Sequence, residues 1–374
     1  MKEESIRRTV DFGVDKPVDV DFNNPVRRFS GNPILTSREV NKVWDSPVWQ
    51  VKTVHNAGIT TMDSETLMLF RSHLRCGKSV LGVARSQNGI DNWRIESKPV
   101  IKPAKEDDIF ANGTDKKALI ENEGGGVEDA RITKIDDTYA ITYSAYHASI
   151  KDRVRVSLIT TKDFVNFIRH GPMLDVDMRN VVLFSEKINN YYVALFRPND
   201  VTEGQTGGIY TQIRIGYTED WKSKKWEIAR KPIMKTDGGP SPFQDKIGPG
   251  APPIKTKKGW LNIFHGVRTT MDGNQYVLGV ALYDLDDPAE VKVSSIPILF
   301  PSKADCQVAE DDYVHVPNVV FTCGAVRRGD GSILIYYGGC DTVMNVGITH
   351  EDLLASLCEI YPQDAVTGEI LYEI

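Results

Sequence analysis

A short phrase built around a proline occurs five times in this chain and constrains its fold more than any other feature. The five copies are Asn32-Pro33-Ile34-Leu35, Lys98-Pro99-Val100-Ile101, Gly171-Pro172-Met173-Leu174, Lys231-Pro232-Ile233-Met234 and Ile296-Pro297-Ile298-Leu299. Successive prolines are separated by 60 to 73 residues. A regular period of this kind indicates a repeat architecture, in which each unit buries its apolar face against its neighbours.

The segments before the last four prolines contain the same order of four strand-length runs. In the first unit these runs are His55–Thr60, Thr66–Arg71, Ser79–Ser86 and Trp93–Glu96. The runs are rich in Val, Ile, Tyr and Phe, and turn residues such as Gly, Asn, Asp and Lys separate them. A fifth unit has three such runs and then a helical pattern at about Glu351–Cys358, so it lacks an outer strand.

The first proline phrase has no unit before it, so we expect the N-terminal segment to supply the missing outer strand. The predicted fold is all-β: a five-bladed β-propeller with four-stranded blades, closed by an N-terminal strand and followed by a short C-terminal helix. Its expected parts are an N-terminal extension (1–30), the catalytic propeller (31–349), and a C-terminal helix and tail (350–374). Closure leaves few exposed sheet edges. The alternative is a pair of β-sandwiches in which the prolines recur by coincidence.

The composition excludes several classes of protein. Asp and Glu number 51 against 45 Lys and Arg, and no basic run occurs, so we expect no nucleic-acid partner. The five cysteines are scattered without a CxxC pair, which indicates neither a disulfide framework nor a zinc site. Since no signal peptide or long apolar segment is seen, we expect a cytoplasmic protein with no membrane association. The terminal segments could pack against a second copy, which leaves a homo-oligomer open.

Polar residues recur at one register of the repeat. The second run of each unit ends in a polar residue, namely Arg71, His147, Arg197, His265 and Asp341, with Tyr337 shortly before the last. Because the first strands of propeller blades line the central channel, we expect Lys246 and Arg131 to join these residues at one mouth. Such cations suit a phosphate or a sugar-acid carboxylate. Taken singly, each arginine could be a solvated strand end, and His265 a packed turn residue.

Asp129 is the clearest carboxylate expected in the channel. Strand alternation places Glu128 and Asp129 on opposite faces, so only one of them should point inward. A carboxylic acid can protonate a glycosidic oxygen, but an inverting hydrolase also needs a second carboxylate to activate water. A phosphorylase needs cations instead, because phosphate is its nucleophile. One carboxylate beside several cations favours phosphorolysis; a structural ion pair between Asp129 and Arg131 is the alternative.

Four groups of residues resemble glycoside hydrolase family 130. They are Gly125–Ile132, Val182–Asn189, Lys246–Ile254 with Gly259–Leu261 and His265–Val267, and Val316–Phe321 with Tyr336–Thr342. The resemblance spans about Asn32 to Asp341 and implies a five-bladed propeller acting as an inverting β-mannoside phosphorylase. Departures occur at Ala130, Phe196 and Gly339-Cys340, and they leave the acceptor preference open.

The resemblance also implies roles for individual residues. Asp129 corresponds to the catalytic acid, acting directly or through a sugar hydroxyl. The phosphate ligands implied are Arg197, Lys246, His265 and Arg131. The sugar contacts implied are Asn56, Arg71 and Asp341, and we add Tyr337 as a candidate.

The predicted reaction is attack of inorganic phosphate on a β-mannoside, giving α-mannose 1-phosphate and the acceptor sugar. The expected substrates are β-1,4-mannosyl-glucose, β-1,4-mannosyl-N-acetylglucosamine or a mannooligosaccharide. Phosphate is a co-substrate, and we expect no cofactor or metal. One alternative is a β-mannoside hydrolase that uses Glu186, Glu128 or Asp63 as its second carboxylate. Another is a sugar-binding propeller without catalytic activity.

Overall fold

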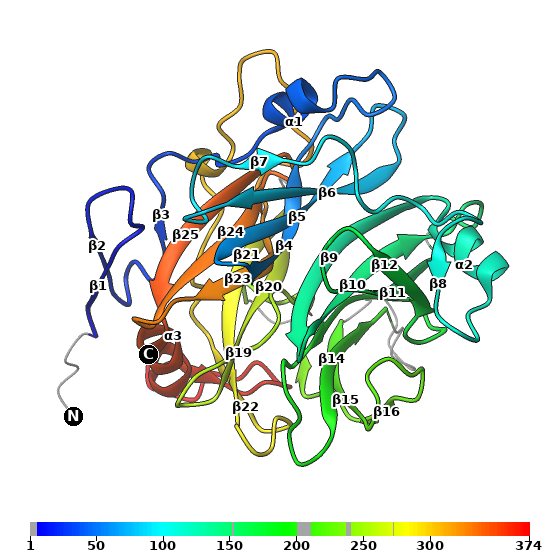
Figure 1. The fold of residues 1–374 in the computed structure, drawn as a ribbon. Coiled ribbons are helices and arrows are strands. Elements are labelled where there is room, and N and C mark those ends of the chain that lie inside the picture. The colour runs from blue at the N-terminus through cyan, green and yellow to red at the C-terminus, as the bar shows by residue number, and fades with distance from the viewer. Residues whose placement is uncertain (1–5, 152, 200–210, 237–240, 272) are drawn as a thin grey trace.

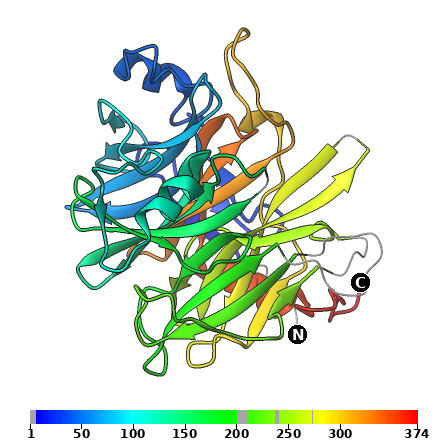
Figure 2. The ribbon, with the colours of Figure 1, turned by 90° about the vertical axis from the view of Figure 1, so that its right-hand side faces the viewer.

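Five mainly antiparallel sheets surround a common axis in the computed structural model, which describes residues 6–151, 153–199, 211–236, 241–271 and 273–374 (Figure 1). Viewed from the side, the blue and cyan, green, yellow and orange sheets follow one another around the molecule (Figure 2). The predicted five-bladed propeller is therefore confirmed, and the sandwich alternative is wrong.

The blades follow chain order, and in each the first strand lies at the axis. Blade I consists of β4 (His55–Met62), β5 (Glu65–His73), β6 (Ser79–Ser86) and β7 (Arg94–Ile95). Blade II consists of β9 (Gly126–Ile135), β10 (Thr138–Tyr146), β11 (Val154–Thr161) and β12 (Phe167–Pro172), with β8 (Ile109–Phe110) at its edge. Blade III consists of β13 (Met178–Leu183), β14 (Tyr192–Pro198), β15 (Gln212–Thr218) and β16 (Glu227–Ile228), with β17 (Met234–Lys235) paired to β15.

The last two blades carry strands from both ends of the chain. Blade IV consists of β18 (Lys246–Pro249), β20 (Trp260–Thr270), β21 (Gly273–Tyr283) and β22 (Val291–Ser294), with β19 (Ile254–Lys255) on β20 and β26 (Pro362–Gln363) on β22. Blade V consists of β23 (Val320–Arg327), β24 (Ser332–Gly339), β25 (Val343–His350) and the N-terminal strand β3 (Arg27–Arg28). The expected closure by an N-terminal strand is thus present, with β3 a few residues ahead of the first proline phrase.

The proline phrases share one structural role, which explains their period. After each outer strand, the phrase returns to the third strand of its blade, as in the bridges Leu35–Met344, Ile101–Leu81 and Leu299–Leu278. In the first two phrases, the second residue after the proline is buried: Leu35 is 2% exposed and Ile101 1%. Proline has no N–H to donate and therefore fits the edge of a sheet, where no further strand accepts a bond.

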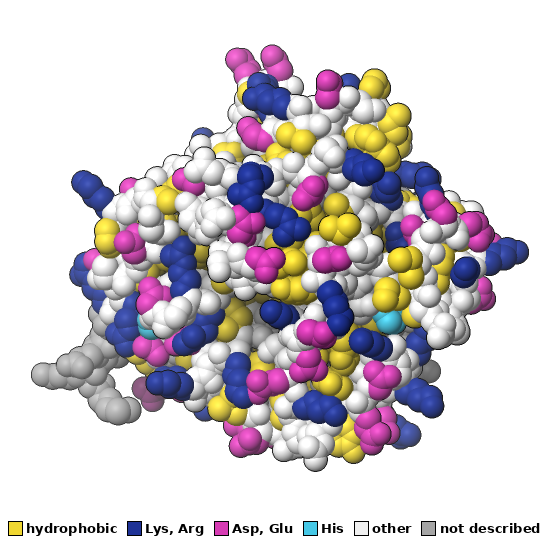
Figure 3. Space-filling model, in the orientation of Figure 1, with side chains coloured by type: hydrophobic (Ala, Val, Ile, Leu, Met, Phe, Trp, Pro, Cys, Tyr) yellow, Lys and Arg dark blue, Asp and Glu magenta, His cyan; other side chains and the backbone are white. Residues whose placement is uncertain are grey.

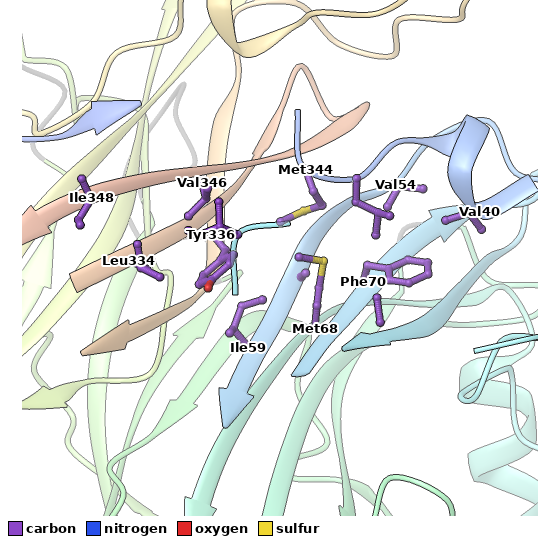
Figure 4. Packing of buried hydrophobic residues seen from close by; sticks show 14 of the residues in the cluster. Val40, Val54, Ile59, Met68, Phe70, Leu334, Tyr336, Met344, Val346 and Ile348 are labelled. Atoms are coloured by element: carbon purple, nitrogen blue, oxygen red, sulfur yellow. The ribbon is translucent and has the colours of Figure 1, made fainter. Parts of the chain in front are cut away.

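Apolar side chains between neighbouring blades hold the ring together. In the cluster between blades V and I, Met68 and Phe70 of β5 lie near Tyr336 of β24 and Met344 of β25 (Figure 4). All four side chains are fully buried. Burial of apolar area is the main favourable term in folding, so these contacts stabilise the closure of the ring.

Short elements decorate the propeller. The helices are α1 (Ser37–Val43), α2 (Lys116–Glu123) and α3 (Glu351–Ile360), and η1 (Lys303–Asp305) is a 3₁₀ turn. The hairpin of β1 (Arg8–Val10) and β2 (Val18–Val20) precedes β3. The helix α3 confirms the predicted C-terminal helix, and Thr36 and Glu39 form a capping box at the start of α1. Within the described ranges, no helix is long and apolar enough to cross a membrane.

Candidate active site

A cavity of about 200 Å³ lies at one end of the propeller axis and receives side chains from all five blades. Its polar lining residues are Asn56, Arg71, Glu128, Asp129, Tyr146, Arg179, Asn180, Arg197, Lys246, His265, Tyr276 and Asp341, and its apolar ones are Val319 and Phe321. It therefore contains seven of the nine site residues predicted from the sequence. The two exceptions are Arg131 and Tyr337.

The innermost strands bend at matching positions, and this bend aims polar side chains into the cavity. Asn56, Asp129 and Asn180 have φ values of 48°, 53° and 57° and lie at register shifts in blades I, II and III. Asn and Asp tolerate this left-handed conformation better than other residues with a side chain. Because the bulge breaks strict alternation, Glu128 and Asp129 both face the cavity. The expectation that only one would point inward is wrong.

The carboxylates gather around Arg71 on the side of blades I, II and V. The Arg71 guanidinium lies 2.9 Å from Glu128 Oε2 and 2.8 Å from Asp129 Oδ1. Asn56 Nδ2 donates to the same Asp129 oxygen at 3.1 Å. Asp129 Oδ2 receives no hydrogen bond from any described residue, so one oxygen of this cavity-lining carboxylate is anchored and the other has no described donor.

The surroundings of the other two carboxylates shift their pKa values in opposite directions. Burial opposes ionisation of Glu128, but Arg71, together with hydrogen bonds from His73 and Ser79, lowers its pKa to about 2. Burial raises the pKa of Asp341 to about 6, and Arg71 offsets only part of that effect. Glu128 is therefore an anion throughout the neutral pH range, whereas Asp341 titrates close to neutral pH.

The opposite side of the cavity carries cations without anionic partners. Arg179 and Arg197 come from blade III and Lys246 from blade IV, and none of them forms an ion pair with a described residue. Burial, followed by repulsion from Arg179, lowers the pKa of Arg197 to about 10. Burial also lowers the pKa of Lys246, and Arg197 and Arg179 lower it further. Cations that repel one another in a partly desolvated cavity form a site that favours an anion.

His265 joins this side as a neutral ring. It is 3% exposed, and burial, with repulsion from Arg197, Arg131 and Lys246, holds its pKa well below the usual value. Its Nε2 lies 3.5 Å from Asn180 Nδ2, and its Nδ1 is buried without a hydrogen-bond partner. At neutral pH, His265 can therefore contribute a ring N–H or a lone pair, but not a charge.

The sequence places Arg179 on a first strand that lines the channel, but the predicted site residues did not include it. It is the third cation of the cavity that has no anionic partner among the described residues. Its Nε is buried without a partner, and its guanidinium lies 5.5 Å from the centre of the Tyr146 ring. A signal was present in the sequence, because Arg179 precedes Asn180 as His55 precedes Asn56 and Glu128 precedes Asp129. Tyr146, Tyr276 and Phe321 were also missed. Tyr146 takes the place expected of His147, whose Nδ1 instead accepts backbone hydrogen bonds from Ser149 and Ile150.

Arg131 lies behind the cavity and serves as a brace between blades. Its Nε donates to the carbonyl of Gly250 at 2.9 Å, and its Nη2 to Asn180 Oδ1 at 3.0 Å. Its Nη1 donates to the backbone carbonyl of Asp129 at 2.8 Å, so the suggested ion pair with the Asp129 carboxylate is not formed. The guanidinium is engaged with protein acceptors, which corrects its expected role as a phosphate ligand.

Three other candidates also lie outside the cavity. Tyr337 is fully buried, and its hydroxyl donates to Asp305 Oδ1 at 2.7 Å, so the expected contact with substrate is wrong. Of the carboxylates considered for a hydrolase, Glu186 pairs with Lys255 at the surface and Asp63 is exposed in the turn between β4 and β5. Only Glu128 lines the cavity, where Arg71 neutralises it.

Basic and acidic side chains are interspersed over the face in Figure 3, without a continuous basic stripe. Among the described residues, no group of three or more His, Cys, Asp or Glu is arranged to hold a metal ion.

Known proteins share both the sequence and the fold. The family model for glycoside hydrolase family 130, described as β-1,4-mannooligosaccharide phosphorylase, matches residues 25–359. A 1,2-β-oligomannan phosphorylase from Thermoanaerobacter sp. (strain X514) is 33% identical over 86% of this chain and 96% of its own. A 4-O-β-D-mannosyl-D-glucose phosphorylase from Bacteroides fragilis is 31% identical over 94% of this chain and 88% of its own.

A solved structure agrees with these sequence relatives. The β-1,2-mannobiose phosphorylase from Listeria innocua, in complex with β-1,2-mannobiose, matches this fold with a TM-score of 0.72. It is 26% identical, and the match covers 90% of this chain and 99% of that one. Since the family model spans nearly the whole propeller, we conclude that the chain belongs to glycoside hydrolase family 130 and is an enzyme of the glycoside phosphorylase type.

Proposed function

We propose that this enzyme catalyses the inverting phosphorolysis of a β-mannoside, releasing α-mannose 1-phosphate and an acceptor sugar. The observation that carries this proposal is the separation of charge across one cavity. Carboxylates surround Arg71 on blades I, II and V, and three cations without anionic partners occupy blades III and IV. An inverting displacement needs such opposite poles, because nucleophile and leaving group lie on opposite faces of the reacting carbon.

In this proposal, phosphate binds to Arg179, Arg197 and Lys246, and one of its oxygens attacks C1 of the mannose. The bond from C1 to the glycosidic oxygen breaks as the new C1–O bond forms. Asp129 Oδ2 supplies the proton that the leaving oxygen takes up, directly or through a sugar hydroxyl. Arg71 and Asn56 hold the other oxygen of Asp129 and so orient it. The neutral His265 contributes a hydrogen bond to the phosphate rather than charge.

Hydrolysis is the second candidate function, and the cavity has fewer of the groups that it requires. An inverting hydrolase needs a base on the side of C1 opposite the acid. Among the described lining residues, that side carries cations and a neutral histidine. Glu128 lies beside Asp129 on the same side, where it is held by Arg71 and by Ser79 at 2.5 Å.

The linkage of the substrate is a variable in the test of this proposal. The relatives bear names that specify β-1,2 as well as β-1,4 linkages. The test is release of sugar from β-1,2- and β-1,4-mannosyl disaccharides with and without inorganic phosphate. We expect release only with phosphate, together with an equal amount of α-mannose 1-phosphate. Equal release in both conditions would contradict the proposal.

Three variants, one of them a control, and one additive sharpen this test. Lys246→Met should abolish the phosphate-dependent release of sugar, whereas Lys255→Met, which removes a surface lysine paired with Glu186, should leave the rate unchanged. Asp129→Asn should remove turnover. We propose that no metal takes part, so EDTA should have no effect on the rate.

A further inference from the structure

A row of rings leads outward from the carboxylate side of the cavity. The His73 side chain lies next to Glu128, with Nε2 3.6 Å from Oε1, and 2.8 Å from the Arg71 guanidinium. The His315 ring is 5.0 Å from the His73 ring, and the Tyr313 ring is 5.8 Å from that of His315. None of these three rings lines the cavity itself, so they extend it toward the surface.

The outer part of this row lies on the connection between blades IV and V. That segment precedes β23 and projects beyond the blades in Figures 1 and 2, coloured gold. The backbone N–H of His315 donates to Thr342 Oγ1 at 2.9 Å, and that of Val316 donates to the Cys340 carbonyl at 3.0 Å. Both anchors flank Asp341 in sequence, so the segment is tied to the edge of the cavity.

The rings are accessible and carry groups that suit a sugar. Tyr313 is 48% exposed, and His315 is also exposed. The Tyr313 hydroxyl lies 2.7 Å from His315 Nδ1, and the Lys52 ammonium lies 5.4 Å from the centre of the Tyr313 ring. Sugars present C–H faces that pack on rings and hydroxyls that bond to imidazole, phenol and ammonium groups.

The position of the row fixes which end of the substrate would contact it. Phosphate occupies the blade III and IV side, so the leaving sugar extends from Asp129 toward blades I and V. The first leaving unit would contact Arg71 and Glu128 in the cavity, and the next unit would reach the rings beyond them. We propose that His73, His315 and Tyr313 form a subsite for a second leaving-side sugar unit, so that the preferred substrate is a mannooligosaccharide of at least three units. This inference rests on the proposed function for the direction in which the substrate lies.

The test measures binding without turnover. Dissociation constants for β-linked mannobiose and mannotriose, in both the β-1,2 and the β-1,4 series, are measured by calorimetry on the Asp129→Asn protein in phosphate-free buffer. For one series, we expect the trisaccharide to bind about tenfold more tightly than the disaccharide. When Tyr313→Ala or His315→Ala is added to the Asp129→Asn protein, the dissociation constant of the trisaccharide should come within about twofold of that of the disaccharide. The dissociation constant of the disaccharide should not change.

A matched control is Tyr191→Ala, because Tyr191 is 43% exposed on blade III and does not line the cavity. It should alter neither constant. Equal binding of both sugars in each series, or an equal loss for both sugars in the Tyr313 and His315 variants, would overturn the subsite. If the wild type cleaves its substrate only with phosphate but the disaccharide and the trisaccharide bind equally, the subsite is refuted and the proposed function stands. Unequal binding without phosphate-dependent cleavage refutes the phosphorylase assignment alone.

Discussion

Replacing Arg197 by methionine should make the free protein more stable while strongly weakening its use of phosphate. Arg197 is 7% exposed and has no described carboxylate partner. Burial, followed by repulsion from neighbouring cations, disfavours its charge and lowers its pKa from the ordinary arginine value to about 10. At about 1.4 kcal/mol per pKa unit, the charged form is disfavoured by about 3 kcal/mol.

Some of that gain is offset by lost contacts. The Arg197 side chain donates to Asn199 Oδ1 at 2.9 Å and to the Ile247 carbonyl at 3.3 Å. The Ile247 carbonyl keeps a bond from Thr211 Oγ1 at 3.1 Å, and methionine preserves most of the apolar stem. A hydrogen bond contributes about 1 kcal/mol, so we expect a net stabilisation of about 1–2 kcal/mol.

Arg169→Met is the matched control. The exposed fraction of Arg169, 5%, is similar to that of Arg197. The Arg169 guanidinium, however, lies 2.6 Å from Glu123 and 2.8 Å from Asp108. Removing it leaves the fully buried Glu123 without its cation, which should cost about 3–5 kcal/mol. The two arginine substitutions should therefore change stability in opposite directions.

The stability of each variant can be measured by unfolding in urea, and its binding of phosphate by thermal melting with increasing phosphate. The wild type should melt at a higher temperature as phosphate increases, because phosphate binds only the folded state. Arg197→Met should lose most of this shift, and its kcat/KM for phosphate should fall by about 10²-fold or more. If Arg197→Met were destabilised as strongly as Arg169→Met, or kept the phosphate shift, the cations would not form an anion site.

Three further predictions concern the carboxylates and the closure of the ring. Because the pKa of Asp341 is raised to about 6 in the folded protein, the folded state keeps a proton that the unfolded chain loses at lower pH. The free energy of unfolding, measured in urea, should therefore fall by up to about 3 kcal/mol between pH 4 and pH 7. Asp341→Asn should remove this fall. Glu128→Gln should lower kcat/KM by less than about tenfold, since phosphate rather than an activated water attacks C1, and a loss of about 10⁴-fold would favour a hydrolase base. Met344→Ala should destabilise the protein by about 2–5 kcal/mol because it opens a cavity between blades V and I, whereas Met271→Ala, at an exposed position, should be neutral.

The repeat could be predicted from the sequence because the proline phrase has one role in every blade. Leu35, Ile101 and Leu299 each return to the third strand of their blade, and that pairing requires the same residue types at the same offset. The strands were predictable for the same reason. The position of β3 was not, since a strand of two residues carries no periodic signal.

At the site, register along the second strands was enough to identify Arg71, Arg197, His265 and Asp341. The errors arose where the backbone departs from strict alternation. The left-handed conformation of Asp129 turns both acidic neighbours inward, and no rule of period two anticipates it. Asparagine or aspartate at matching places in three first strands was the available signal, and it would also have pointed to Arg179.

Arg131 and Tyr337 show a second limit. Both are polar residues near the axis, and whether such a residue faces the cavity or the layer behind it depends on which partners reach it. Arg131 finds the Gly250 carbonyl and Tyr337 finds Asp305, each contributed by a distant segment of the chain. Sequence spacing within one blade carries no information on those partners.

The most direct test of the divided cavity is a crystal structure of the enzyme with phosphate and a β-mannoside bound to the Asp129→Asn variant. We expect the phosphate oxygens within hydrogen-bonding distance of Arg179, Arg197 and Lys246, with the glycosidic oxygen facing residue 129 from the other side of C1. Phosphate bound beside Arg71, or a sugar unit lying directly against the three cations in its place, would contradict the account.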